Sequence, residues 1–441
     1  MKILVIGQQK FGETTASIFS KIPVEVKIAS DEAGIQSGLS SHASVNLVLL
    51  DGDFFKSRED KIFSLLRQIR KTGKPVVFLS SRRVFSYLLK IKNSGVTDYL
   101  LKPYNERELV MRVNAVLQKK IRVTCIGGGT GLFHLLIGLK TMPHVLLTSV
   151  VSMSDDGGSS GKLSRSLGLL PPGDIRRSLV ALSNAPDIMN QIMQYRFDKK
   201  GELGGHSFGN IFLAALAGVK GTMSEAVRSL SDILYLQGIV LPASRTRTKL
   251  VATFENGAVI KGESKIDRAV GRAANLRIAS LRHEPESEAD ADAVAAILFS
   301  DYITIGPGDL YTSIVTNLAI RHIRDAILAS HGKKIYICNL MTKPGETSGF
   351  DAADHVEEIV KYLGRDSLDF VLISNTKLSR QAITDYRKKD QVPVDFRNTK
   401  NVKSLTAAKI IAADIGDTRE LVRHDSAHLR TAIQKIIGAA S

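Results

Sequence analysis

The sequence of 441 residues contains only two cysteines. This scarcity excludes a disulfide-stapled scaffold and any zinc site built from cysteines. Long apolar runs are also absent, since stretches such as Val294–Phe299 are far shorter than the roughly 18 residues that a membrane-spanning helix needs. The first residues lack the apolar segment and the small-residue cleavage site of a signal peptide, so the sequence predicts a cytoplasmic protein.

The chain has no internal repeat and no low-complexity tract, and no Pro-, Gly- or Ser-rich linker lies near residue 120. A helical stretch ends near Lys119-Lys120, and the apolar segment Ile121–Ile126 follows at once. The sequence therefore predicts two directly packed α/β domains, residues 1–120 and residues 121–441.

Positive charge exceeds negative charge, with 60 Lys and Arg against 44 Asp and Glu and a net charge of +16. The excess is spread along the chain, without a basic arm or a basic helix interleaved with aromatic residues. This distribution predicts a solvated surface with phosphate-binding arginines and argues against a nucleic-acid partner. Apolar residues make up 44% and charged residues 24%, which are globular values and exclude a largely disordered chain.

Short apolar strands alternate with amphipathic helical stretches in the first domain. This alternation predicts a five-stranded parallel sheet with helices on both faces. The expected strands are Lys2–Ile6, Val24–Ala29, Val45–Leu50, Pro75–Leu79 and Thr97–Leu100, and the expected helices are Glu13–Lys21, Lys61–Lys71, Arg82–Asn93 and Glu106–Lys119.

The ends of these strands carry Asp51, Ser80 and Lys102, and the segment resembles the receiver domain of two-component response regulators. The resemblance implies that Asp51 is the phospho-acceptor, Ser80 the hydroxyl that contacts the phosphoryl group, and Lys102 its counter-charge. Such a set is chemically sensible, because a carboxylate nucleophile needs a cation and a hydrogen-bond donor to stabilise the charge of the transferred group. Asp51 alone is equally consistent with a polar cap on a strand end.

One departure from the receiver pattern concerns the metal. Receivers carry an acidic pair after the first strand to hold Mg²⁺, and here those positions are Gly7-Gln8. Asp51 and Asp53 leave a weakened metal site as an alternative, but the pattern favours a degenerate receiver. Such a domain would serve docking of a signalling partner, or homodimerisation through the apolar helix Glu106–Gln118.

The second domain begins with a strand, Ile121–Ile126, a glycine-rich turn and a helical segment, Phe133–Leu139. In this context backbone N–H groups and a helix N-terminus can hold phosphate, although a tight structural turn is the alternative. The residues of the turn are Gly127, Gly128, Gly129, Thr130, Gly131 and Leu132.

The next strand, Val145–Val151, ends in two carboxylates and a polar loop. Carboxylates at this place hold a ribose hydroxyl or Mg²⁺, and the glycines and serines after them can wrap phosphate; a flexible polar loop is the alternative. The residues are Asp155, Asp156, Gly157, Gly158, Ser159 and Ser160.

A helix that opens at Asp174 follows, then further polar residues. Asp174 suits a helix cap, whereas Arg176 in the first turn opposes the helix dipole and is better explained by an anionic partner. Arg196 and Asn210 are further candidate ligand contacts, and His206 is more often a satisfied loop histidine than a catalyst.

Two later strands, Ile303–Ile305 and Lys334–Cys338, also end in polar turns, and Thr246–Ile266 predicts an accessory β-hairpin turning at Asn256-Gly257. The turns offer N–H groups and hydroxyls for a second anion contact and amide groups for a base or sugar. The candidates are Gly306, Gly308, Asp309, Thr312, Ser313, Asn339, Thr342 and Glu346.

Six motifs of this domain have the order and spacing of those in the YvcK/CofD-like family, which the domain resembles closely. The residues within these motifs are similar to those of the YvcK branch. The resemblance implies a Rossmann-like α/β fold and a gluconeogenesis factor, a regulator that binds a UDP-sugar such as UDP-N-acetylglucosamine and controls the cell envelope. The motifs are Gly127–Leu132, Asp155–Gly161, Pro171–Arg176, Gly205–Asn210, Gly306–Ser313 and Asn339–Thr347.

The CofD branch implies an alternative, a 2-phospho-L-lactate transferase that moves a phospholactyl group from a nucleotide-activated donor to a deazaflavin. In that case Asp156 and Asp174 would hold a Mg²⁺ ion. An NAD-type oxidoreductase lacks a hydride-transfer constellation here. Asp309 and Lys343 depart from the serine and glutamine that are usual in the YvcK pattern. These departures leave the identity of the ligand open.

Overall fold

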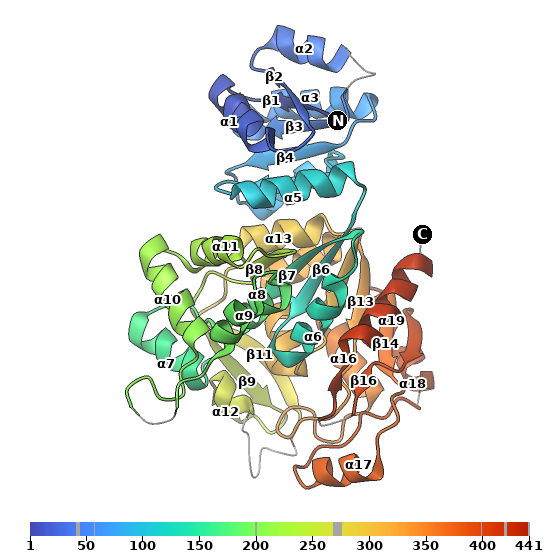
Figure 1. The fold of residues 1–441 in the computed structure, drawn as a ribbon. Helices are drawn as coiled ribbons and strands as arrows, with labels where there is room; N and C mark the ends of the chain where they lie inside the picture. Colours follow the sequence, from blue (N-terminus) through green and yellow to red (C-terminus); the bar gives the residue numbers. More distant parts are fainter. Residues whose placement is uncertain are drawn as a thin grey trace.

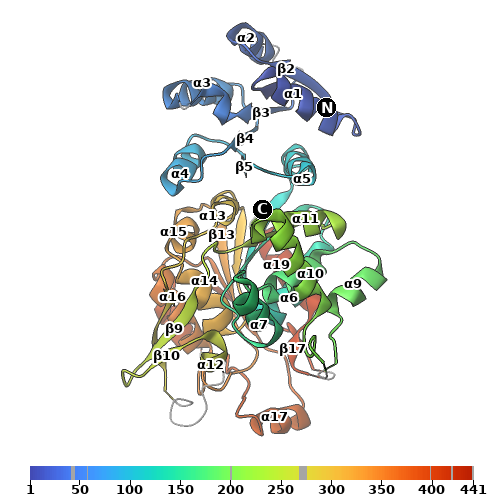
Figure 2. The same ribbon diagram turned by 90° about the vertical axis from the view of Figure 1, so that its left-hand side faces the viewer.

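The computed structural model describes residues 1–40, 45–56, 58–198, 201–267, 276–397, 399–418 and 421–439. A small N-terminal α/β unit sits at one end of a larger α/β unit (Figures 1 and 2). Helix α13 of the larger unit and helices α4 and α5 of the small unit lie at the junction.

The N-terminal unit is a five-stranded, wholly parallel sheet in the order β2-β1-β3-β4-β5, which confirms the predicted fold class. This is the strand order of flavodoxin-like folds, to which receiver domains belong. Its strands are β1 (Lys2–Ile6), β2 (Glu25–Ala29), β3 (Leu47–Asp51), β4 (Val76–Ser80) and β5 (Asp98–Leu101), and its helices are α1 (Gln9–Phe19), α2 (Glu32–Ser40), α3 (Glu59–Lys71), α4 (Phe85–Asn93) and α5 (Glu106–Leu117).

Helix α2 is missing from the sequence prediction. It holds Gly34 and Gly38, which weaken helix propensity and interrupt the apolar periodicity. Gly38 is nevertheless required, because a Cβ atom there would lie 2.7 Å from the Leu4 side chain of the sheet.

The larger unit is built on a seven-stranded parallel sheet in the order β15-β14-β13-β12-β6-β7-β8. The chain builds one half of the sheet from β6 outward to β8 and later the other half from β12 outward to β15, so the order reverses between β6 and β12. The strands are β6 (Ile121–Gly127), β7 (Val145–Val151), β8 (Ile239–Pro242), β12 (Tyr302–Ile305), β13 (Lys333–Ile337), β14 (Phe370–Ser374) and β15 (Lys409–Ala413).

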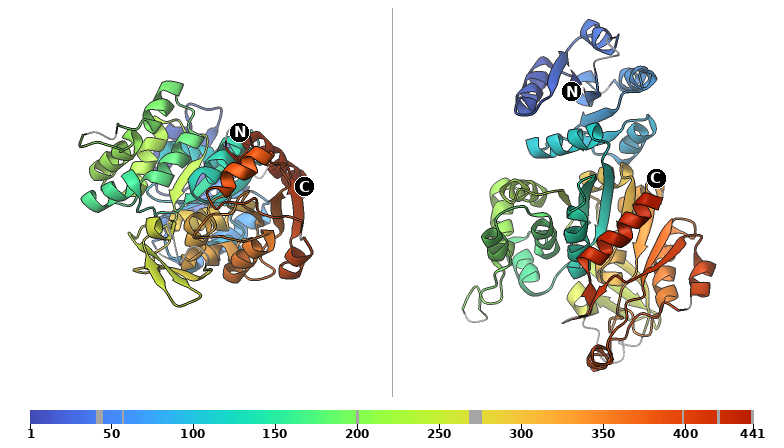
Figure 3. Two further views of the ribbon diagram at one scale, coloured as in Figure 1. Left: turned by 90° about the horizontal axis from the view of Figure 1, so that it is seen from below. Right: turned by 45° about the vertical axis from the view of Figure 1, so that its right-hand side comes forward.

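Helices cover both faces of this sheet (Figure 3). The last helix, α19, drawn in red, packs against α6. The helices are α6 (Gly129–Lys140), α7 (Gly158–Leu167), α8 (Gly173–Leu182), α9 (Asp187–Gln194), α10 (Phe208–Lys220), α11 (Met223–Ile233), α13 (Ala291–Leu298), α14 (Thr316–Leu318), α15 (Arg321–Ala329), α16 (Ala352–Leu363), α17 (Arg380–Arg387), α18 (Thr399–Leu405) and α19 (Ser426–Ala439).

The predicted hairpin is present as a small antiparallel insertion. Strand β9 (Lys249–Phe254) pairs with β10 (Val259–Lys261) and with β11 (Ile278–Glu284), and Gly257 in the turn has φ +82°. The short helix α12 (Glu263–Asp267) follows β10 and returns toward the main sheet.

One hydrophobic cluster spans the two units, and each unit has a further cluster of its own. A single cluster of buried residues runs from Tyr99 of β5 to Phe299 after α13, whose rings lie 5.9 Å apart. Every residue of α13 is buried. Across the described residues, no helix combines the length and apolar character needed to cross a membrane.

Candidate functional site

The crevice between β6 and β12 is lined by two glycine turns. The backbone N–H of Gly306 donates to the carbonyl oxygen of Ile126 at 2.9 Å, which ties the turns together. A Cβ atom at Gly131 would lie 2.8 Å from the backbone of Pro307, so the turns touch only because a glycine stands there. In open α/β sheets a ligand binds at this reversal of strand order, outside the carboxyl ends of the strands.

The turn after β6 faces a carboxylate of the same chain. A Cβ atom at Gly128 would lie 2.6 Å from Oδ2 of Asp174, and the backbone of Gly129 hydrogen-bonds the same carboxylate. Thr130 is exposed at the crevice and Leu132 is buried in the core. At least one backbone N–H donor of the turn is therefore engaged by Asp174.

The sequence suggested that Asp174 caps helix α8, but the structure does not place it there. The N-cap position is Pro172, and Asp174 stands in the first turn with its side chain directed to the glycine turn. Burial raises the pKa of Asp174, while an ion pair with Arg177 at 3.1 Å lowers it. A buried carboxylate of this kind suits a proton or a metal ion as its partner.

The adjacent carboxylates after β7 have different partners. Asp155 accepts the Gly157 N–H at 2.9 Å, and its Oδ2 lies toward Gly173, next to Asp174. Asp156 instead accepts two hydrogen bonds from Ser264, from its N–H at 2.8 Å and its hydroxyl at 2.6 Å. The carboxylate of Asp155 thus faces the crevice, whereas that of Asp156 anchors α12.

Glu263, at the start of α12, is a site residue that the sequence analysis missed. Burial raises its pKa well above the usual range, and the nearby charges of Asp155 and Asp174 raise it further. The Ser154 hydroxyl donates to Glu263 at 2.8 Å. Four carboxylates, Asp155, Asp156, Asp174 and Glu263, therefore gather around the ends of β6 and β7. A proton or a divalent cation would relieve their mutual repulsion.

Helix α8 also carries a basic residue, Arg176, two positions after Asp174. The Arg176 side chain is buried, and its guanidinium donates to Oδ1 of Asn210 at 2.9 Å and to the carbonyl oxygen of Met193 at 3.4 Å. No ion pair joins it to any carboxylate in the described part of the chain. Burial, the largest cause, and the charges of Arg177 and Arg196 together lower the pKa of Arg176 to about 10, although the charges of Asp174 and Asp155 oppose them.

Asn210 connects Arg176 to the polar loop after β7. Its amide nitrogen donates to the hydroxyls of Ser159 at 3.2 Å and Ser160 at 3.3 Å. Nδ1 of His206 lies 3.2 Å from the Ser159 hydroxyl. The structure thus joins four sequence-predicted residues into one network with Arg176. Gly157 and Gly158 begin the adjoining helix α7 and Arg196 lies at the exposed rim.

The turn after β12 already holds an anion of its own. Buried Glu346 accepts the N–H groups of Tyr311 and Thr312 at 3.0 and 3.3 Å and the Thr312 hydroxyl at 2.9 Å. Thr312 therefore offers these donors to Glu346 rather than to the crevice. Ser313 differs, since its hydroxyl lies about 3.5 Å from the place of a Cβ atom at Gly129, facing the first turn.

Lys343 neutralises this second turn. Its ammonium contacts Asp267, Asp309 at 2.6 Å and Glu346 at 3.1 Å. Oxygens of these three carboxylates lie within 4.8 Å of one another, a spacing that a metal ion could bridge. Burial lowers the pKa of Lys343, but the three carboxylates outweigh it and raise that pKa. The departures at positions 309 and 343 thus form an ion pair with each other.

The last predicted contacts stand at the end of β13. Thr342 is buried and exchanges hydrogen bonds with the backbone of Val392, so its role is structural in this conformation. Asn339 is half-buried, and its Oδ1 has no hydrogen-bond partner among the described residues. Asn339 therefore keeps an acceptor for a ligand and Thr342 does not.

The receiver-like pocket of the N-terminal unit lies elsewhere, at the carboxyl ends of β3, β4 and β5. Lys102 contacts Asp51 at 2.6 Å, and Ser80 lies beside Asp53. At Gly7 a Cβ atom would lie 2.7 Å from Phe11 and 3.0 Å from Cβ of Asp51, so no side chain fits where a receiver carries an acid. No third acidic, histidine or cysteine ligand joins Asp51 and Asp53 in the described residues.

These features define a doubly wound α/β protein whose switch-point crevice combines clustered carboxylates with a buried arginine. The chain belongs to the 2-phospho-L-lactate transferase CofD family, whose model matches residues 123–415.

Relatives within this family carry one recurrent name. A putative gluconeogenesis factor of Thermotoga maritima is 42% identical over 318 residues, which are 72% of this chain and 99% of the relative. The gluconeogenesis factor of Bacillus subtilis is 37% identical over 70% of this chain and 95% of its own. A crystal structure of a UPF0052 family member from Bacillus halodurans superposes with a TM-score of 0.67 at 37% identity, over 71% of this chain and 99% of the other.

Proposed function

We propose that this protein is a regulator of central carbon metabolism that binds a nucleotide-sugar of the UDP-N-acetylglucosamine type in the switch-point crevice. The names of the relatives, gluconeogenesis factors, support the metabolic role. We extend the proposal to action in the cytoplasm and to control of the cell envelope.

Buried Arg176 is the observation that carries the proposal. The Arg176 side chain is 6% exposed and forms no ion pair with a carboxylate of the described residues, so a bound anion would offset the cost of burying its charge. A diphosphate group is such an anion, with oxygens that match the guanidinium geometry. The hydroxyls of Ser159 and Ser160 lie next to Asn210, the partner of Arg176, and the Ser313 hydroxyl lies beside the glycine turn.

The carboxylates of the crevice fit a divalent cation beside the diphosphate. Asp155 and Asp174 are the best placed ligands, because Asp156 is engaged with Ser264. Bound Mg²⁺ would neutralise phosphate charge next to these carboxylates. Asn339 would accept a hydrogen bond from the base or the sugar.

Calorimetric titration with UDP-N-acetylglucosamine, with and without Mg²⁺, tests the proposal. Micromolar binding should depend on Mg²⁺ in the wild type, lose that dependence in Asp174→Asn and disappear in Arg176→Met. Asp156→Ala should retain more affinity than Asp174→Asn, because its carboxylate faces α12. Absence of binding to the wild type under all conditions would refute the nucleotide-sugar assignment.

A CofD-like transferase is the second candidate, favoured by the family match over residues 123–415. In this case the bound Mg²⁺ would polarise the diphosphate linkage of a guanosine-type donor. Half-buried Glu263, with its raised pKa, would hold a proton near the reacting groups. Consumption of donor in the presence of a deazaflavin and Mg²⁺ would establish the transferase, whereas binding without turnover supports the regulator.

A further inference from the structure

The carboxylate of Asp53, in the receiver-like pocket, accepts hydrogen bonds at the end of β4 and forms an ion pair at the end of β5. The Ser80 hydroxyl donates to Oδ1 at 2.9 Å, and the Ser81 N–H lies 3.1 Å from both oxygens. The Lys102 ammonium lies 3.4 Å from Oδ2. A hydroxyl, an N–H group and an ammonium that converge on one point form an oxyanion site.

The same pocket orients Asp51 beside that anion. Oδ1 of Asp51 accepts a hydrogen bond from Lys102 at 2.6 Å and from the Asp53 N–H at 3.1 Å. Burial raises the pKa of Asp53, but hydrogen bonds from Ser81 and Ser80 and the charge of Lys102 outweigh it, so the pKa is lowered. Asp53 is therefore an anion whenever the protein is near neutral pH.

We propose that this pocket is an oxyanion site whose resident ligand is the Asp53 carboxylate, which takes the place that a phosphoryl group on Asp51 would occupy. The three donors that would bind such a group, Ser80, Ser81 and Lys102, are all engaged by Asp53. The domain holds its anion-bound conformation permanently, and an external oxyanion binds only when the Asp53 carboxylate is removed.

The pocket is connected to the larger unit by the residues that follow β4. The Ser80 hydroxyl accepts the Arg82 N–H at 3.2 Å, and the Tyr99 hydroxyl donates to the Arg82 carbonyl oxygen at 3.1 Å. Next along the chain, the Arg83 guanidinium donates to the carbonyl oxygen of Lys102 at 2.8 Å and to Asp292 of α13 at 3.2 Å. Arg83 thus contacts both the lysine strand end and the larger unit.

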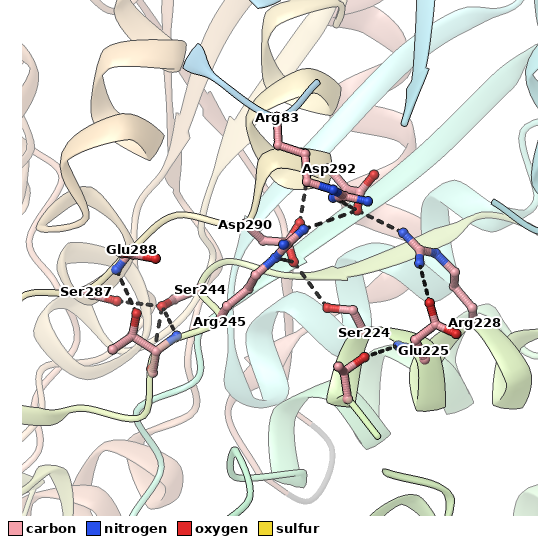
Figure 4. A network of polar contacts seen from close by, with 12 residues as sticks. Arg83, Ser224, Glu225, Arg228, Ser244, Arg245, Ser287, Glu288, Asp290 and Asp292 are labelled. Carbon is pink, nitrogen blue, oxygen red and sulfur yellow. Dashed lines mark hydrogen bonds and ion pairs between the residues drawn. The ribbon is translucent and has the colours of Figure 1, made fainter. Parts of the chain in front are cut away.

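Figure 4 shows where this contact leads. Asp292 also accepts a hydrogen bond from Arg228 of α11 at 2.8 Å. The neighbouring Asp290 accepts one from Arg245, in the segment that enters the hairpin, at 2.9 Å. The Asp53 anion therefore orders a loop whose arginine reaches the point where α11, α13 and the hairpin segment meet, so the partner of the receiver-like unit is the larger unit of the same chain.

Hydrogen–deuterium exchange on the full-length protein tests this proposal. Asp53→Ala should speed amide exchange in residues 80–84 by about tenfold or more, because the anion that orders them is lost. Acetate in excess, which supplies the missing carboxylate, should restore slow exchange, and inorganic phosphate should do the same. Asp60→Ala removes an exposed carboxylate of α3 and should leave these residues unchanged.

One further variant, Asp53→Asn, and one ligand, phosphate, keep the test decisive if Asp53→Ala fails to fold. Asp53→Asn keeps the shape of the side chain and loses its charge. Amide exchange in residues 80–84 should be faster than in the wild type, but by less than in Asp53→Ala. Phosphate should shift the Ser81 amide signal in this variant and leave it unchanged in the wild type. Unaltered exchange in both variants, no rescue by either anion, or phosphate binding in the wild-type pocket would overturn the proposal.

Discussion

Replacing Arg176 by methionine is expected to stabilise the ligand-free protein while it weakens ligand binding. The Arg176 side chain is buried and forms no ion pair among the described residues, and the charges of Asp174 and Asp155 only partly offset the cost of burying its charge. Methionine is flexible, unbranched and uncharged, so it can follow the path of the aliphatic part of the arginine side chain.

The size of the effect follows from the pKa of Arg176, which is lowered from 12.5 to about 10. At roughly 1.4 kcal/mol for each tenfold change, this depression corresponds to about 3 kcal/mol against the charged form. Methionine also leaves Oδ1 of Asn210 without its donor, a loss of about 1 to 2 kcal/mol. The free energy of unfolding should therefore rise by roughly 1 to 2 kcal/mol and Tm by a few degrees.

Denaturant unfolding and calorimetric titration on the same preparations measure both effects. Affinity for the nucleotide-sugar should fall at least about 30-fold, as expected for a lost charge-assisted contact. Arg196→Met removes the same charge from the exposed rim, and it should change the unfolding free energy by less than about 0.5 kcal/mol. If Arg176→Met destabilises the protein and leaves affinity intact, the arginine is structural and the reasoning fails.

Three further outcomes are expected. Glu263 has a raised pKa in the folded protein, so the stability that it contributes at a pH below its ordinary pKa of 4.5 is lost as the pH rises. Glu263→Gln mimics the protonated form, and it should flatten the decline toward pH 8 of the unfolding free energy measured with denaturant. An unchanged slope would contradict the assignment. Gly138→Ala should lower stability by about 1 to 3 kcal/mol in thermal unfolding, because its Cβ would overlap the Ser426 carbonyl oxygen of α19, while Gly218→Ala in open space on α10 should not destabilise. Lys343→Gln should cost about 2 to 4 kcal/mol by leaving buried Glu346 beside two other carboxylates, and Ca²⁺ or Mg²⁺ should raise Tm in this variant and not in the wild type.

Much of the fold could be predicted because strands buried on both faces have an unambiguous pattern. The bounds of β1 and β7 agree to the residue with the prediction, since each is a mostly apolar segment in which only Lys2 of β1 and Thr148-Ser149 of β7 are polar. Helix α2 could not be predicted in the same way. Its glycines remove helix propensity, and its position depends on packing against Leu4.

The sequence could locate the candidate site but could not predict the hydrogen-bond partners of its side chains. Strand ends of one parallel sheet meet at one edge, which brings Asp155, Asp174 and the glycine turns together. Which carboxylate takes which donor depends on tertiary distances between remote segments. Ser264 lies 108 residues from Asp156 and Glu346 lies 34 residues from Thr312, so these pairs leave no local signal.

Helix α13 has one consequence for how the protein unfolds. It belongs to the larger unit in sequence, yet all its residues are buried because the N-terminal unit covers its outer side. Separating the chain after Lys120 would therefore expose apolar surface on both fragments, around Phe299 on one and Tyr99 on the other. The two sheets should melt in one cooperative calorimetric transition, and neither fragment should match the stability it has in the intact chain.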